Sequence, residues 1–206
     1  MNIDFGLVLV VFTVLLASLT FHEAAHAWSA DRLGDPTARQ LGRVSLNPAV
    51  HIDPIGTIVF PLIAMVTGFP LIGWAKPVPV NTVNLRDHWK QKYMVIAAAG
   101  PASNLILALA SAAVVAGLGF ENSGQLVFEF FRWMVTINVL LAVFNMIPVP
   151  PLDGGNVLAG LLPGRAHEVF EAIRPYGFLV LYGLLFSGLL FRFVSPVQNA
   201  IEDWLL

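Results

Sequence analysis

The chain has 206 residues, of which 57% are hydrophobic and only 12% are charged, and its mean hydropathy is +0.75. Soluble domains carry about 25% charged residues, so this composition excludes an ordinary soluble domain and a disordered chain. The net charge of −2 gives no reason to expect a nucleic-acid partner. Because the chain has no cysteine, disulfides and cysteine nucleophiles are excluded as well. We predict an all-α polytopic membrane protein in which residues 1–206 form one domain within the lipid bilayer.

Four apolar stretches are long enough to cross a membrane as a helix, which takes about 20 residues. They are residues 5–21 with a continuation to 30, 93–120, 126–147 and roughly 177–194. A fifth stretch, 55–72, is apolar but is interrupted by two prolines and a glycine. Irregular backbone at membrane depth must be lined by protein or water. We therefore expect about four to six transmembrane helices and a re-entrant, partly extended (β-like) region near residues 40–80.

The basic residues cluster in three of the connecting segments. Segment 31–53 holds three, segment 73–92 holds four and segment 148–175 holds two of the 11 Lys and Arg residues. The positive-inside rule places these segments in the cytoplasm. We thus predict a multi-pass protein of the cell (inner) membrane whose first span runs from outside to inside. Segment 55–72 would then begin and end on the cytoplasmic side, which favours a re-entrant element over a fifth crossing.

The first apolar stretch ends in the sequence H-E-A-A-H at positions 22–26. Positions i and i+4 share one face of a helix, so His22 and His26 can both reach one metal ion. Glu23 projects nearby, where it can take a proton from a metal-activated water. His22 lies 17 residues after Phe5, about 26 Å along a helix, in a hydrocarbon core about 30 Å thick. Ionisable groups at that depth are usually functional; the alternative is a pair of interfacial histidines with a snorkelling glutamate.

A hydrolytic zinc site needs three protein ligands, so the two histidines require a third His, Asp or Glu. The candidates in or near apolar segments are His51, Asp53, His88, Glu129 and Asp153. Glu129 lies at the outer end of its span, a bilayer away from the histidines. Asp153 follows a proline-rich break and precedes Gly154-Gly155 at the cytoplasmic end of the third span, which matches the depth of His22. The sequence favours Asp153 as the ligand; the alternative is an N-cap for a short helix over 154–162.

His51 and Asp53 lie close in sequence to the predicted cavity. A ligand histidine usually donates its other N–H to an acceptor, and these residues could supply one. We favour instead a role in capping a turn, because Asp53-Pro54 is typical of a helix start.

The motifs resemble those of the site-2 protease family of intramembrane zinc metalloproteases. The matching sequences are H-E-A-A-H at 22–26, G-P-A-S-N at 100–104 and N-M-I-P-V-P-P-L-D-G-G at 145–155. Residues 34–58 and 73–81 resemble a short, mostly bacterial branch of the family that lacks PDZ and CBS domains. The likeness covers nearly the whole chain.

This resemblance implies a zinc endopeptidase that hydrolyses peptide bonds in or near transmembrane segments of membrane-protein substrates. It implies one Zn²⁺ per chain, held by His22, His26 and Asp153 towards the cytoplasmic side, with Glu23 as general base. Asn145 matches the family asparagine that holds the substrate backbone or the developing oxyanion, and Asn104 is a second candidate for that role. The alternative function is a non-catalytic metal-binding membrane protein, such as a zinc carrier or a scaffold.

A substrate helix must unwind before its peptide bonds can be attacked, and the unwound segment then needs main-chain partners. The alternating run at 41–46 is a candidate edge strand for this purpose. The alternative is a plain surface loop.

Overall fold

The computed structural model describes residues 4–68, 73–118 and 125–206, and within these ranges every regular element is helical. The prediction of an all-α fold is therefore confirmed for the described part of the chain. The elements in order are α1 (Phe5–Arg32), α2 (Thr37–Gln40), η1 (Pro48–Val50), η2 (Pro54–Val59), α3 (Phe60–Thr67), α4 (Trp89–Leu118), α5 (Gln125–Asn145), α6 (Asp153–Leu161), α7 (Gly164–Ile173), η3 (Arg174–Tyr176), α8 (Gly177–Phe186) and α9 (Leu189–Leu205).

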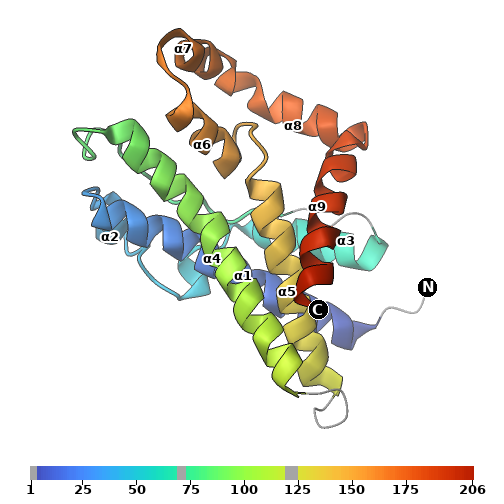
Figure 1. Ribbon diagram of the computed structural model, residues 1–206. Coiled ribbons are helices and arrows are strands. Elements are labelled where there is room, and N and C mark those ends of the chain that lie inside the picture. Colours follow the sequence, from blue (N-terminus) through green and yellow to red (C-terminus); the bar gives the residue numbers. More distant parts are fainter. Residues whose placement is uncertain (1–3, 69–72, 119–124) are drawn as a thin grey trace.

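Three long helices, α1, α4 and α5, form the centre of the molecule, and α4 and α5 run side by side (Figure 1). Val14 of α1 and Ile137 of α5 belong to one buried apolar cluster. A second cluster joins Ala108 of α4 to Val139 of α5. Small residues such as alanine let helix backbones approach closely, which is the main source of packing between helices in lipid.

Four helical stretches in the described ranges are long and apolar enough to cross a membrane: Phe5–Arg32, Trp89–Gly117, Leu126–Asn145 and Gly164–Phe186. The last of these combines α7, η3 and α8. The first three coincide with predicted spans. The predicted fourth span, 177–194, is wrong as one continuous helix, because α8 ends at Phe186 and α9 begins at Leu189. Gly188 between them has a φ of 72°, a left-handed conformation that glycine adopts readily. Apolarity alone carries no signal for such a break.

The region near residues 40–80 is built from short helical pieces. Pro54–Val59 is a π-helical turn that leads into α3, and together they make an apolar element of 14 residues, about 21 Å long and too short to cross the core. Segment 41–46 forms turns and bends, and 73–80 has no regular secondary structure. The β-like part of the prediction is thus not found in the described residues, and the end of the predicted segment 55–72 lies outside them.

The C-terminal third covers one end of the bundle. Helices α7, η3 and α8 follow one another across that end, and α9 turns back along α5 (Figure 1). A Cβ at Gly177, the first residue of α8, would lie 2.2 Å from the carbonyl oxygen of Pro150. The start of α8 therefore presses on the proline-rich turn between α5 and α6, which is the turn that places Asp153.

Candidate active site

The H-E-x-x-H side chains lie on a buried face in the second half of α1. His22, Glu23 and His26 are each less than one tenth exposed. The two imidazole rings meet edge to face, with centroids 4.6 Å apart and an interplanar angle of 84°. Their Nε2 atoms are 3.0 Å apart, as the one-turn spacing predicts.

The turn after α5 brings Asp153 to these histidines. Leu152 is the N-cap of α6 and Asp153 is the first residue of the helix, so the capping role that the sequence left open for Asp153 is wrong. A Cβ at Gly154 would lie 2.2 Å from the Met146 carbonyl oxygen, and one at Gly155 would lie 2.7 Å from the Pro150 nitrogen. The two glycines therefore let the first turn of α6 pack directly on the preceding backbone, which fixes the position of Asp153.

One carboxylate oxygen of Asp153 completes a triangle with the two imidazole nitrogens. Asp153 Oδ2 is 3.1 Å from His22 Nε2 and 3.4 Å from His26 Nε2. These three edges of 3.0–3.4 Å match a tetrahedral zinc site, whose bonds of about 2.0–2.1 Å give ligand–ligand distances of about 3.3 Å. Among the described residues, His22, His26 and Asp153 form a group whose ligand atoms lie close enough together to bind one metal ion.

The hydrogen bonds around the triangle occupy the other nitrogen, Nδ1, of each histidine. His26 Nδ1 lies 2.7 Å from the Ile96 carbonyl oxygen, to which it must donate, and His22 Nδ1 lies 2.6 Å from Asn104 Oδ1. In the neutral imidazoles, both Nε2 atoms are then free to accept. Asp153 Oδ2 is buried with no well-formed hydrogen bond. Three buried lone pairs at this separation repel one another unless a cation lies between them, so the donor set fits a metal ion.

Helix α4 approaches the histidines so closely that only glycine fits at the contact. A Cβ at Gly100 would lie 2.4 Å from His26 Nε2 and 2.6 Å from His22 Cε1. Asn104 is one turn further along α4, on the same face, and meets the other nitrogen of His22. The G-P-x-x-N spacing at 100–104 thus combines space for the imidazoles with an acceptor for one of them.

Glu23 is held by the backbone of a non-helical segment, residues 73–80, which we call the strap. The Val78 N–H donates to Glu23 Oε2 over 3.0 Å. Because Pro77 and Pro79 have no N–H, Val78 is the donor available in this part of the strap. Glu23, the predicted general base, is therefore positioned by a main-chain group rather than by another side chain.

Comparison with known proteins bears on the identity of this site. The profile of Peptidase family M50 matches residues 120–187, which include Asp153. A Bacillus subtilis protein named "Putative zinc metalloprotease YwhC" is 36% identical over 201 residues, which cover 93% of this chain and 87% of the relative. The chain belongs to peptidase family M50. It is thus a zinc metalloprotease of the site-2 protease family, as the motifs predicted.

Mycobacterial members of the family are more distant. The Mycolicibacterium smegmatis protein "Putative zinc metalloprotease Rip2" is 31% identical over 91% of this chain and 70% of its own length. The Mycobacterium tuberculosis protein "Putative zinc metalloprotease Rip3" is 29% identical, and the match covers 77% of this chain but 32% of the relative. No solved structure matches this protease significantly.

The two predicted substrate asparagines occupy different environments. Asn145, the last residue of α5, is half-buried and donates through Nδ2 to the Leu141 carbonyl oxygen, 2.9 Å away. Asn104 is completely buried and its amide oxygen faces His22. Its amide nitrogen donates to Asn138 Oδ1 over 2.8 Å. Asn104 therefore has no group left for a substrate, whereas Asn145 keeps a second N–H.

The strap is braced by residues that sequence reasoning placed in turns. Asp53 caps η2 by accepting from the N–H groups of Ile55 and Gly56, which confirms its predicted capping role. His51 donates through Nε2 to the Ser45 carbonyl oxygen and, through its own carbonyl, accepts from Lys76. Burial lowers the pKa of His51, and the charge of Arg43 acts in the same direction.

Arg43 holds the other backbone group of the same strap residue. Its guanidinium donates to the Lys76 carbonyl oxygen, and the side chain is only 5% exposed. Burial lowers the pKa of Arg43, an effect that the Glu23 charge opposes. The backbone N–H and the backbone carbonyl of Lys76 are therefore both held by hydrogen bonds, two residues before Val78. The hydrogen bonds at Lys76 therefore also restrict the nearby backbone of Val78, whose N–H holds Glu23.

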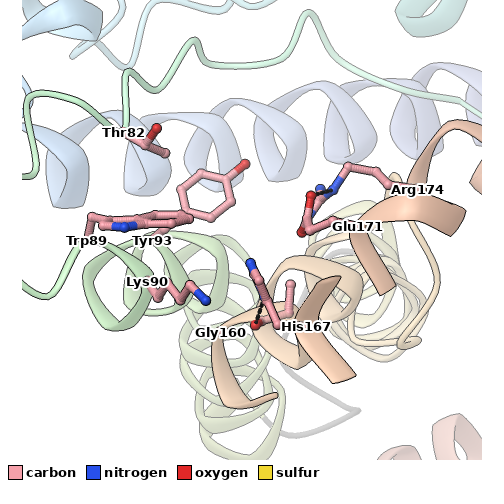
Figure 2. Close-up of a pocket in the computed structure, with 9 residues that line it drawn as sticks. Thr82, Trp89, Lys90, Tyr93, Gly160, His167, Glu171 and Arg174 are labelled. Atoms are coloured by element: carbon pink, nitrogen blue, oxygen red, sulfur yellow. Dashed lines mark hydrogen bonds and ion pairs between the residues drawn. The ribbon is translucent and has the colours of Figure 1, made fainter. Parts of the chain in front are cut away.

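A pocket of about 300 Å³ lies between α4 and the α6–α7 region. Figure 2 shows Tyr93 and Lys90 on one side and the Glu171–Arg174 ion pair on the other. None of the three triangle residues lines it. Arg174 also donates to Asn156 Oδ1 over 2.6 Å, so this pair ties η3 to α6, the helix that begins with Asp153.

Sequence reasoning missed several residues that support the site. Ser18 and Asn138 are fully buried beside Asn104, and Val78 holds Glu23. A polar amide such as Asn138 inside an apolar span is a usable signal, because a polar group there needs a partner. The role of Val78 leaves no signal, since a backbone N–H is common to almost every residue.

Gly100→Ala should displace the two histidines and weaken zinc binding. The added Cβ lies within van der Waals distance of both imidazoles, and misplacing metal ligands costs at least about tenfold in metal affinity. The zinc content of purified protein and its competition with a chelator measure the effect.

Gly117→Ala is the matched control. It lies in the same helix, and nothing is within 4 Å of its Cβ position, so zinc affinity should stay at the wild-type value. Equal zinc affinity in the two variants would contradict the assigned contact at Gly100.

Proposed function

We propose that this protein is an intramembrane zinc endopeptidase that hydrolyses peptide bonds in or near transmembrane segments of membrane proteins. The observation that supports this most directly is the convergence of His22, His26 and Asp153 Oδ2 into a triangle with edges of 3.0–3.4 Å. These side chains would bind one zinc ion per chain. Two ligands come from a helix long and apolar enough to span a bilayer, which favours chemistry at membrane depth.

When bound, zinc supplies a Lewis acid that polarises the scissile carbonyl group and makes the attacking water more acidic. Glu23 acts as the general base. Its Oε2 accepts from Val78, which leaves the other carboxylate oxygen to take the proton from water and to pass it later to the leaving amine. An ordered base contributes typically 10²–10⁴-fold to such a reaction.

Asn145 is the proposed donor to the developing oxyanion. One N–H of its amide is used within α5 by the Leu141 carbonyl, so the second N–H remains for the substrate oxygen. The side chain is half-buried at the end of α5, seven residues before Leu152. An amide donor held by its own helix needs little rearrangement to stabilise charge.

The location of the site within the membrane determines which class of substrate can reach it. We propose that the basic segments 31–53, 73–92 and 148–175 lie on the cytoplasmic side of the cell (inner) membrane and that the site opens there. A transmembrane helix satisfies its own backbone hydrogen bonds. Substrates would therefore be single membrane helices that unwind near the site before Glu23 and Asn145 act on them.

A zinc carrier or scaffold is the competing function, and it predicts different behaviour for one variant. Glu23→Gln should retain zinc, because Glu23 is not in the ligand triangle, and should lose proteolysis by at least about 100-fold. His22→Ala and Asp153→Ala should lose zinc as well as proteolysis. Metal analysis of purified protein and cleavage of a single-pass membrane substrate in proteoliposomes measure both properties.

Glu168→Gln is the matched control for this experiment, because Glu168 is exposed on α7, and it should cleave at the wild-type rate. Full proteolysis by Glu23→Gln, or zinc transport without cleavage by the wild type, would rule out the proposed function.

The role of the strap generates a separate prediction. Val78→Pro removes the N–H that positions Glu23 and should lower the cleavage rate by about 10- to 100-fold, part of what an ordered base supplies, with zinc content unchanged. Val78→Ala keeps the N–H and should cleave at nearly the wild-type rate. If the two variants cleave equally well, the strap does not position the base.

A further inference from the structure

Three uncharged polar side chains from three different helices meet in the centre of the bundle. Ser18 of α1, Asn104 of α4 and Asn138 of α5 each have 0% relative exposure. Burying an amide or hydroxyl group without a partner costs a few kcal/mol. Each of these groups is hydrogen-bonded, and the chain of bonds ends at His22.

The direction of this chain of bonds is set at one end by backbone carbonyl groups. Asn138 Nδ2 lies 2.8 Å from the Met134 carbonyl oxygen and 2.8 Å from Ser18 Oγ. Ser18 Oγ in turn donates to the Val14 carbonyl oxygen over 2.8 Å. Since carbonyl oxygens only accept, the amide nitrogen of Asn138 must face Met134 and Ser18. The amide oxygen of Asn138 must then face Asn104.

The same logic fixes the next two members. Asn138 Oδ1 accepts from Asn104 Nδ2 over 2.8 Å, and Asn104 Nδ2 also faces the Ser18 carbonyl oxygen at 3.4 Å. Asn104 Oδ1 is therefore the atom 2.6 Å from His22 Nδ1. An oxygen acceptor at that position requires the proton of the neutral imidazole to sit on Nδ1, which leaves the lone pair on Nε2.

We propose that Ser18, Asn138 and Asn104 form a relay that holds His22 in the Nδ1–H tautomer and so presents its Nε2 to the metal. Asn104 and Asn138 are positioning residues, because they act through His22. The inference rests on the proposed function, since it assigns Nε2 of His22 as a zinc ligand. It also replaces the substrate-binding role that the sequence suggested for Asn104.

His26 provides an internal comparison. Its Nδ1 donates directly to the Ile96 carbonyl oxygen over 2.7 Å. The two ligand histidines thus have the same tautomer, but one obtains it from the main chain and the other from side chains. Only the His22 half of the site depends on the relay.

Two substitutions at one position separate this role from packing. Asn104→Leu keeps the volume but removes the acceptor, and zinc affinity should fall by about 10- to 100-fold, as is typical when the hydrogen-bond partner of a ligand is lost. Asn104→Asp keeps an oxygen against His22 Nδ1 and, as the neutral carboxylic acid, an O–H that can donate to Asn138 Oδ1, so zinc affinity should recover to within about tenfold of wild type. A packing role predicts the reverse order of zinc affinity, with Leu tolerated better than Asp, because Leu fills a similar volume without burying another polar or charged group.

The full-length protein, purified in detergent, is titrated with zinc against a chelator, and its unfolding is followed by circular dichroism. Thr136→Val is the matched control: it removes an α5 hydroxyl that faces Glu202 rather than the relay, and zinc affinity should not change. Where Asn104→Leu does not fold, Asn138→Leu replaces it, with an expected loss of at least about threefold because Asn104 loses its orienting acceptor.

Wild-type affinity in the folded Leu variant, or an Asp variant that binds no better than the Leu variant, would overturn the relay. If that happens while His22→Ala still abolishes zinc binding, the proposed function stands and the relay alone fails. If His22→Ala binds zinc like the wild type, both fail together.

Discussion

The site depends on three potential ligand atoms, His22 Nε2, His26 Nε2 and Asp153 Oδ2, which lie within 3.4 Å of one another inside an apolar helix bundle. That arrangement is unfavourable without a cation, because buried acceptors that face each other lose their hydration and repel. The surrounding architecture makes it possible. Helix α1 supplies two of the atoms, and the glycine-rich start of α6 supplies the third.

The contacts that support the site are of two kinds. Glycines leave space for neighbouring groups, and hydrogen bonds orient the side chains of the site. Gly100, Gly154 and Gly177 make room, since each occupies a position where a Cβ would lie within 2.4 Å of another atom. The orienting contacts are hydrogen bonds, to the other nitrogen of each histidine and to one oxygen of Glu23. Space without orientation would leave the imidazoles free to rotate, so both kinds of contact are needed for a fixed ligand geometry.

The features of this protein that can be predicted from its sequence are those that depend on the chemistry and spacing of particular side chains. Spacing placed His22 and His26 on one helix face, and the depth of the proline-rich break pointed to Asp153. Three of the four spans followed from hydropathy. The break at Gly188 did not, because a run such as 177–194 is equally apolar whether it is straight or bent.

Other features were hidden for a physical reason. The bond from Val78 to Glu23 joins residues 55 positions apart through a backbone group that every residue except proline has. Asn104 was only a second candidate for substrate binding, and its contact with His22 was not predicted, because the sequence does not show which neighbour a buried amide meets. Its true environment depends on how α4 and α5 pack, and that packing is encoded by many small residues together rather than by a motif.

The hydrogen-bond acceptors of the two histidines differ in how readily a mutation can remove them. The acceptor for His26 is a carbonyl oxygen at position 96, and every amino acid carries one, so no missense change in that codon deletes it. The acceptor for His22 is a single side chain at position 104. A mutation at position 104 can therefore change the tautomer of His22 while His26 keeps its own. Inherited changes in metal affinity that act through these acceptors thus affect His22 and not His26.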